Sequence, residues 1–187
     1  MKKWIITTGF FLLAIQITKA QERFYTKGGE IRFYSKAPLE TIEAVNKSVT
    51  CVMDTKIGLV QFVVLMKGFE FRKALMQEHF NENYVESDKF PKAEFKGQIT
   101  NNAEINYGKN GTYEAKVKGR LFIHGEARDI ETTGTITIEA GKIKLNSVFN
   151  ILLADYKISI PSTVADNISK SVRITVNCSL TELKTNN

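Results

Sequence analysis

Apolar and polar residues alternate along most of the chain after residue 28. The run 92–99 has charged or amide side chains on one face and apolar residues or glycine on the other. The runs 112–123 and 129–139 repeat this pattern. A period of two with one wet face and one dry face is typical of half-buried β-strands. The alternation predicts eight strands, which cover residues 29–37, 42–53, 57–67, 92–100, 112–124, 127–139, 141–153 and 171–182.

Turn residues separate several of these runs. Asn110-Gly111 predicts a tight turn just before the strand that starts at residue 112, because both residue types tolerate positive φ angles. Ala140-Gly141 predicts a second hairpin. Eight antiparallel strands joined mostly by hairpins can close into an up-and-down barrel, which removes exposed edges. We therefore predict an all-β, eight-stranded antiparallel barrel, with a two-sheet sandwich as the alternative architecture.

Two segments depart from the alternation. Residues 73–84 place apolar side chains at helical spacing between Leu75 and Tyr84 among charged and amide residues, which predicts a short amphipathic helix. Residues 162–170 follow Pro161 and have apolar spacing for one or two helical turns. The sequence contains no internal repeat, low-complexity tract or linker. These features predict one domain with one or two short helices.

Small residues occur on the predicted inner face of the strands. They are Gly97, Ala115, Gly119, Gly134 and Ser147, and they share that face with larger apolar residues. An eight-stranded barrel is just wide enough either to be filled by side chains or to enclose one small ligand. Small inward residues favour a cavity, whereas the alternative is that the glycines relieve strain where strands bend at barrel corners. The pattern alone leaves both interpretations open.

The two cysteines, Cys51 and Cys178, both have inward parity in their predicted strands. In an up-and-down barrel the second and eighth strands both flank the first. They are then two strand spacings apart, about 9–10 Å, whereas a disulfide needs Cα atoms within roughly 7 Å. We therefore predict two free, buried thiols.

The N-terminal segment has the features of a secretory signal peptide. Lys2 and Lys3 precede an uncharged apolar stretch, and Thr18 and Ala20 offer small side chains at the −3 and −1 positions of a cut before Gln21. A membrane anchor is the alternative, but the stretch is shorter than the roughly 20 apolar residues that span a bilayer. We expect residues 1–20 to be removed and residues 21–187 to form one domain in the periplasm or the medium.

Charge and length narrow the range of partners. The net charge of +6 falls to +3 when the three lysines of the first 20 residues are removed. The remaining positive charge does not gather into a basic helix, so we expect no nucleic-acid partner. The longest later apolar run, 57–66, is far too short to cross a membrane. No transmembrane segment is therefore expected in the mature chain.

The sequence offers little catalytic chemistry. Neither His79 nor His124 has a second histidine or a cysteine at metal-ligand spacing, so no metal site is predicted. No Gly-x-Ser-x-Gly elbow and no glycine-rich phosphate loop occurs. Asp88 and Asp155 lack a partner that the sequence can identify. We predict no catalytic residue and no enzymatic activity.

Longer motifs resemble the YceI-like family. These are LMQEHFNENY at 75–84, ESDKFPKAEFKG at 86–97, GRLFIHG at 119–125, and Ala-Asp-Tyr at 154–156 with Ile-Pro at 160–161. The resemblance extends over about 29–183 in the expected order. It implies an exported, lipocalin-like barrel that binds a polyisoprenoid or an isoprenoid quinone in its interior. No other cofactor is implied.

The predicted function is therefore non-catalytic carriage of an apolar isoprenoid-type lipid, by a monomer or a homodimer. Two alternatives remain, an accessory protein that binds an envelope protein through its outer face and an enzyme that acts on an isoprenoid. We expect the lipid to contact apolar side chains of the inner face and the helix. They are Phe33, Val49, Phe62, Val64, Met66, Met76, Phe80, Phe95, Ile99, Val117, Leu121, Ile136 and Phe149.

Overall fold

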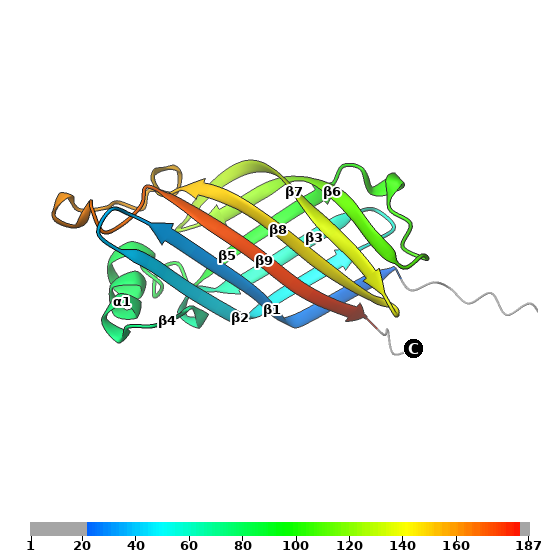
Figure 1. Cartoon of the computed structure of the whole chain (residues 1–187), viewed down its shortest axis with the longest axis horizontal. Helices are drawn as coiled ribbons and strands as arrows, with labels where there is room; N and C mark the ends of the chain where they lie inside the picture. Colours follow the sequence, from blue (N-terminus) through cyan, green and yellow to red (C-terminus); the bar gives the residue numbers. More distant parts are fainter. Residues whose placement is uncertain (1–21, 184–187) are drawn as a thin grey trace, which may run out of the picture.

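Eight antiparallel strands form a closed ring in the computed structural model, which describes residues 22–183 (Figure 1). Around the ring the order is β1-β9-β8-β7-β6-β5-β3-β2, and β2 pairs back onto β1. The strands are β1 (Arg23–Lys36), β2 (Thr41–Asp54), β3 (Leu59–Leu65), β5 (Lys92–Ile99), β6 (Gly111–Ile123), β7 (Glu126–Glu139), β8 (Lys142–Leu152) and β9 (Ser171–Glu182). The predicted barrel is confirmed, and the ring closure rules out the two-sheet sandwich.

All eight predicted strands are present, with two differences. β1 begins six residues earlier than predicted, at Arg23 rather than at residue 29. Its pairing with β2 shifts register on both sides of Gly29, so the alternation is broken there. A two-residue strand, β4 (Glu70–Phe71), pairs with β2 and is too short to show a period in the sequence.

The hairpin connections confirm one predicted turn and correct another. Ala140 and Gly141 both have positive φ angles, 49° and 73°, as a two-residue hairpin turn requires. The tight turn predicted at Asn110-Gly111 is wrong. β5 and β6 are joined by residues 100–110, which include the 3₁₀ turn η3 (Asn102–Glu104). Tyr107 Oη donates a hydrogen bond to Asn102 Oδ1 at 2.7 Å, and this contact helps to hold the longer connection together.

The predicted helix at 73–84 forms as two parts. α1 (Ala74–His79) continues into a π-helical turn, η2 (Phe80–Tyr84). The segment 162–170 forms only one 3₁₀ turn, η5 (Ser162–Val164), and other 3₁₀ turns occur at η1 (Met66–Gly68) and η4 (Leu153–Tyr156). Within residues 22–183, no helix has the length and apolarity needed to cross a membrane. The proposed signal peptide lies outside the described residues.

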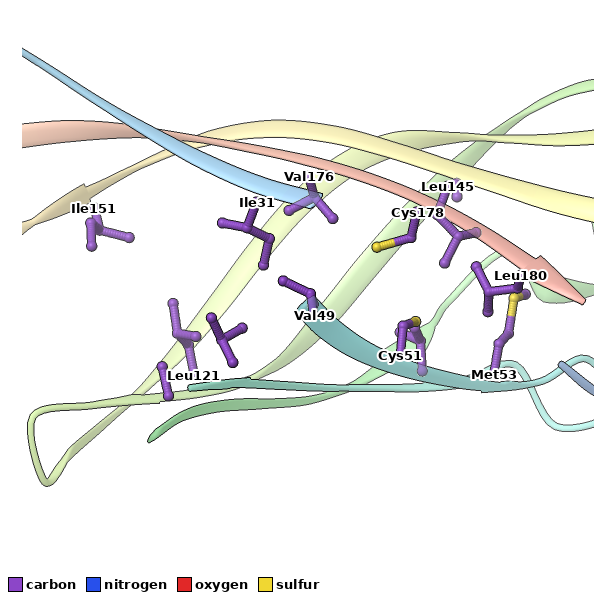
Figure 2. Close-up of a cluster of buried hydrophobic side chains, with 14 of the residues drawn as sticks. Ile31, Val49, Cys51, Met53, Leu121, Leu145, Ile151, Val176, Cys178 and Leu180 are labelled. Carbon is purple, nitrogen blue, oxygen red and sulfur yellow. The ribbon is translucent and has the colours of Figure 1, made fainter. Parts of the chain in front are cut away.

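Side chains fill the barrel at the end where β9 terminates (Figure 2). Val49, Cys51, Met53, Ile143 and Leu180 are at most 1% exposed, and they come from three different strands. α1 lies at the opposite end of the barrel (Figure 1). The half of the interior near the end of β9 is therefore packed with side chains. The other half lies near α1.

Both cysteines are free and buried, as predicted. β1 lies between β2 and β9, so the two backbones are not adjacent. A side chain at Gly29 of β1 would collide with the Cys178 Sγ atom, so the glycine leaves room for that thiol. The neighbouring Cys178 thiol and burial both raise the pKa of Cys51.

Candidate functional site

An apolar cavity of about 420 Å³ occupies the half of the barrel near α1. Inward side chains from all eight barrel strands surround it, although the central residues of β2 do not take part. α1 and η2 cover its end. Strand alternation positions this lining, because residues two apart along each strand point to the same face. The cavity is therefore a product of the same pattern that predicted the strands.

Twelve of the thirteen predicted lipid-contact residues line this cavity. They are Phe33, Phe62, Val64, Met66, Met76, Phe80, Phe95, Ile99, Val117, Leu121, Ile136 and Phe149. Val49 does not line it, because this residue is fully buried in the packed half of the barrel. Strand alternation predicts the inward parity of Val49 but cannot show where the packed half of the barrel lies. Contact between the twelve side chains and a lipid stays a prediction.

The small inward residues have two different roles. Ala115, Gly134 and Ser147 line the cavity, as the cavity interpretation predicted. The interpretation is wrong for Gly97 and Gly119, which do not line it. A Cβ on Gly97 would lie 2.5 Å from the Phe95 ring, and one on Gly119 would lie 2.5 Å from the Gly97 Cα. These two glycines allow a close approach of ring and backbone, and they do not leave empty volume.

Four aromatic rings cover the cavity at the α1 end. Phe33, Phe69, Phe71 and Phe80 have ring centroids 5.0–5.7 Å apart in tilted, edge-on and stacked pairs. These separations are in the favourable range for aromatic contacts. The rings come from β1, β4, η2 and the turn before β4, so they join segments that are distant in the sequence.

The sequence interpretation missed several lining residues. Ile130, Ile151, Val172, Ile174 and Val176 line the cavity from β7, β8 and β9. Strand parity could have identified all five, since each has the same parity as a predicted residue or as the inward cysteine of its strand. Ile158 also lines the cavity but lies in an irregular segment after η4, where no period could have identified it.

Polar atoms are sparse in the lining. Thr132 Oγ1 and Ser147 Oγ lie 3.3 Å apart on β7 and β8, and Ser147 donates a hydrogen bond to the Thr133 carbonyl at 2.7 Å. Glu40, His79 and Asn167 reach the cavity near α1. Such a surface can solvate an apolar chain, with a few hydroxyl and polar groups at defined places.

His124 joins three segments beside the cavity. Its Nδ1 lies 3.0 Å from the Tyr156 carbonyl oxygen, and its Nε2 lies 2.7 Å from Glu86 Oε2. Both partners are acceptors, so both ring nitrogens donate when the imidazole carries two protons. The hydrogen bond from His124 holds the pKa of the Glu86 carboxyl below its usual range. The arrangement connects the β6–β7 turn, the segment before β5, and η4.

Metal-binding and catalytic constellations are not evident in the described part of the chain. Among residues 22–183, no group of three or more histidine, cysteine or acidic residues could hold a metal ion. Apart from Glu86 with His124, the ionisable pairs with lowered acidic pKa values, such as Arg120 with Asp129 at 2.9 Å, lie on exposed parts of the strands. The chemistry that the geometry supports is therefore burial of an apolar ligand.

Comparison with known proteins places this geometry among related barrels. A family profile described as the YceI-like domain matches residues 9–180. A solved polyisoprenoid binding domain from Saccharophagus degradans, implicated in plant cell wall breakdown, has a TM-score of 0.75 at 14% identity and covers 88% of this chain and 100% of that chain. BcnA from Burkholderia cenocepacia has a TM-score of 0.66 at 16% identity, with coverage of 81% and 95%. None of the curated proteins matches the sequence.

A third structure, the YCEI protein of Campylobacter jejuni, is similar over the full length. Its TM-score is 0.51 at 15% identity, and the alignment covers 99% of this chain and 100% of that chain. Identities this low show a shared fold. The ligand has to be argued from the cavity of this chain.

Proposed function

The chain belongs to the YceI-like family, and on that premise we propose that the protein binds and carries an apolar isoprenoid-type lipid inside its barrel, without catalysing a reaction on it. The observation that carries this proposal is the cavity of about 420 Å³, whose lining is almost entirely aliphatic and aromatic. Pockets for small ligands have volumes of roughly 300–1,000 Å³ and mainly apolar walls. The solved relative described as a polyisoprenoid binding domain supports the choice of ligand class.

Hydrophobic transfer alone is strong enough to retain such a ligand. Each buried CH₂ group contributes about 0.8 kcal/mol, so one five-carbon isoprene unit contributes roughly 3–4 kcal/mol before ordering costs. A few buried units are therefore sufficient for tight binding without a charged contact. The ligand can be a polyisoprenoid or the tail of an isoprenoid quinone, and the proposal requires no other cofactor.

We also propose that the protein works outside the cytoplasm, in the periplasm or the medium. Support comes from the two N-terminal lysines, the apolar stretch and the small residues before Gln21. In these compartments an apolar isoprenoid has very low solubility in water, so a carrier would keep it dispersed.

Native mass spectrometry of the purified mature protein tests the proposal. We expect a mass above that of the polypeptide, and organic extraction should release an isoprenoid lipid that accounts for the difference. The same spectrum reports whether the protein is a monomer or a homodimer. The proposal would be wrong if the protein carried no lipid and if neither all-trans-retinol, a fluorescent isoprenoid alcohol, nor a short-chain ubiquinone bound in titrations.

A further inference from the structure

β7 and β8 pair over only part of their lengths. Their ladder runs from Glu139↔Lys142 to Gly134↔Ser147 and ends there. Beyond that point β7 keeps its pairing with β6 as far as Glu126, and β8 keeps its pairing with β9 as far as Leu152. Residues 126–133 and 148–152 therefore each have a partner on one side, and within residues 22–183 no strand pairs with their other side. The two ribbons diverge toward the left of Figure 2.

Particular residues end the ladder. A side chain at Gly134 would collide with the Asn146 carbonyl oxygen, so the strands approach closely at this glycine. At the next residue, the Thr133 carbonyl accepts a hydrogen bond from Ser147 Oγ at 2.7 Å. The hydroxyl groups of Ser147 and Thr132 thus both donate to this carbonyl at the point where the main-chain ladder has ended. The contact between Thr133 and Ser147 therefore marks the point where β7 separates from β8.

The gap between the strands opens on the cavity. Ile130 and Thr132 on the β7 side line the cavity, as do Phe149 and Ile151 on the β8 side. Ile130, Thr132 and Phe149 are only partly buried although they have inward parity. On the outer surface of β8, Val148 and Leu152 are 59% and 51% exposed. Apolar side chains therefore lie along this gap both on the inside of the barrel and on the outer surface of β8.

In contrast to this gap, both ends of the barrel are covered. The packed half closes the end where β9 terminates, and the four phenylalanine rings cover the α1 end. The turn between β1 and β2 also contacts the η5 region there, since Leu39 N–H donates to the Asp166 carbonyl at 3.0 Å. Near the outer end of the gap, Lys157 Nζ lies 2.6 Å from Glu126 Oε1 and anchors the segment after η4.

β2 and β3 also separate beyond the end of their ladder, but other residues close the barrel wall there. The ladder between these strands ends at Thr50↔Val63. There the fully buried Asn46 donates from Nδ2 to the Leu65 carbonyl at 2.8 Å, and β4 pairs with β2 at Val45↔Glu70. A polar side chain and an extra strand therefore close the wall at this place. Between β7 and β8 the edges beyond Ser147 carry no such strand within the described residues.

We propose that the gap between residues 126–133 of β7 and residues 148–152 of β8 is a lateral portal through which the apolar chain enters and leaves the barrel. The inference rests on the proposed lipid-binding function. Edges without a shared ladder can move apart without breaking main-chain hydrogen bonds between them, whereas entry through any fully paired seam would break several. The partly buried side chains Ile130 and Phe149 line the cavity on opposite sides of the opening and act as its gate.

A covalent bridge across the gap tests the portal. Glu131 and Asn150 are exposed on the outer surface on opposite sides of the gap. The Glu131→Cys/Asn150→Cys protein, freed of lipid, is cross-linked with a short bis-maleimide and mixed with all-trans-retinol in a stopped-flow fluorimeter. We expect the bridge to slow both association and dissociation of retinol by about tenfold or more, with little change in Kd because both rates fall together.

The matched control uses the same Glu131→Cys substitution. In Lys118→Cys/Glu131→Cys the linker joins β6 to β7, which are already paired at these two residues. This bridge should leave retinol kinetics at the wild-type rates. A second variant acts in the opposite direction, because Ile130→Ala widens the gate and should accelerate both association and dissociation.

The outcomes separate the portal from the lipid-binding function. Slow exchange in the bridged β7–β8 protein and faster exchange in Ile130→Ala support the portal. Wild-type exchange rates in both proteins, with retinol still bound, would show that the chain enters elsewhere while the carrier function stands. If wild-type protein itself bound neither retinol nor a short-chain ubiquinone, the carrier function and the portal would both be wrong.

Discussion

Gly97 of β5 lies directly opposite Gly119 of β6, and the ring of Phe95 occupies the space above both glycines. A Cβ atom on Gly119 would lie 2.5 Å from the Gly97 Cα and 2.6 Å from Cζ of Phe95. Real Cβ atoms do not approach other atoms so closely. The two glycines therefore allow an aromatic ring to lie flat against the barrel wall, which is a packing role often found beside strand glycines.

Gly119→Ala is expected to destabilise the protein. Alanine normally stabilises a strand relative to glycine by roughly 0.5–1 kcal/mol, but here overpacking should lower the free energy of unfolding by about 1–3 kcal/mol. Urea denaturation measures the change. Gly28→Ala is the control, because no heavy atom lies within 4 Å of a Cβ built at Gly28. Equal stability of the two variants would contradict the packing role of Gly119.

The barrel could be predicted from sequence because strand alternation reports which side chains face inward. Together with the helical spacing that gave Met76 and Phe80, that signal identified twelve residues that line the cavity, but it could not show which half of the barrel is packed, so it included Val49. It also could not show that the Phe95 ring occupies the space beside Gly97. Alternation depends on neighbours along one strand, whereas filled and empty volume depends on side chains from several strands.

The gap between β7 and β8 is equally invisible in the sequence. Alternation continues through residues 129–139 and 141–153 whether or not the two strands pair there. The end of the ladder depends on Ser147 and the Thr133 carbonyl, a contact between residues on different strands. In the same way, the local turn signal at Asn110-Gly111 lay inside a longer connection that is held by Tyr107 and Asn102.

The Glu86 carboxylate should stabilise the fold only when it is ionised. Its pKa in the folded protein is lowered by the hydrogen bond from His124, so its contribution is present above the unfolded pKa of about 4.3 and is lost as pH falls. We expect Glu86→Gln to melt at a lower temperature than wild type near neutral pH. The difference should shrink as the pH falls below about 4.3 and vanish once the pH is below the lowered pKa of Glu86 in the folded protein.

Thermal melting across this pH range checks the Glu86 prediction. Glu114→Gln, a change to an exposed carboxyl on the outer face of β6, serves as the control and should track wild type throughout. A Glu86→Gln deficit that stayed constant from neutral to acidic pH would mean that the contact with His124 does not depend on the carboxylate charge.

Cys51 and Cys178 should be unreactive in the folded protein. Both side chains are buried, and the pKa of the Cys51 thiol is raised, so little thiolate is accessible. Ellman's reagent should modify neither thiol until the protein is unfolded, and then both. Asn150→Cys supplies an exposed thiol as the positive control. Intact mass measured without reductant decides the pairing, since a mass lower by two hydrogen atoms would reveal a disulfide.

The mature chain should begin at Gln21 when the full sequence is expressed in a bacterium. Thr18 and Ala20 place small side chains at the −3 and −1 positions of the cut, as a signal-peptide cleavage site requires. N-terminal sequencing of the protein in the envelope fraction or the medium measures the cleavage site. Ala20→Leu should block the cut and leave the uncleaved precursor. An exported protein that retained Met1 would show that the segment is a membrane anchor.

A paired tryptophan substitution tests most directly whether the lipid lies inside the barrel. Val117 lines the cavity, and Lys118, the next residue, is exposed on the outer face. Val117→Trp places an indole in the space proposed for the lipid, whereas Lys118→Trp adds the same group outside. The measurement is the Kd for all-trans-retinol by fluorescence titration, on proteins that thermal melting shows to be folded. We expect Val117→Trp to raise the Kd by at least about tenfold, or 1.4 kcal/mol, while Lys118→Trp binds like wild type. Folded Val117→Trp protein that binds retinol with wild-type affinity would contradict an interior site.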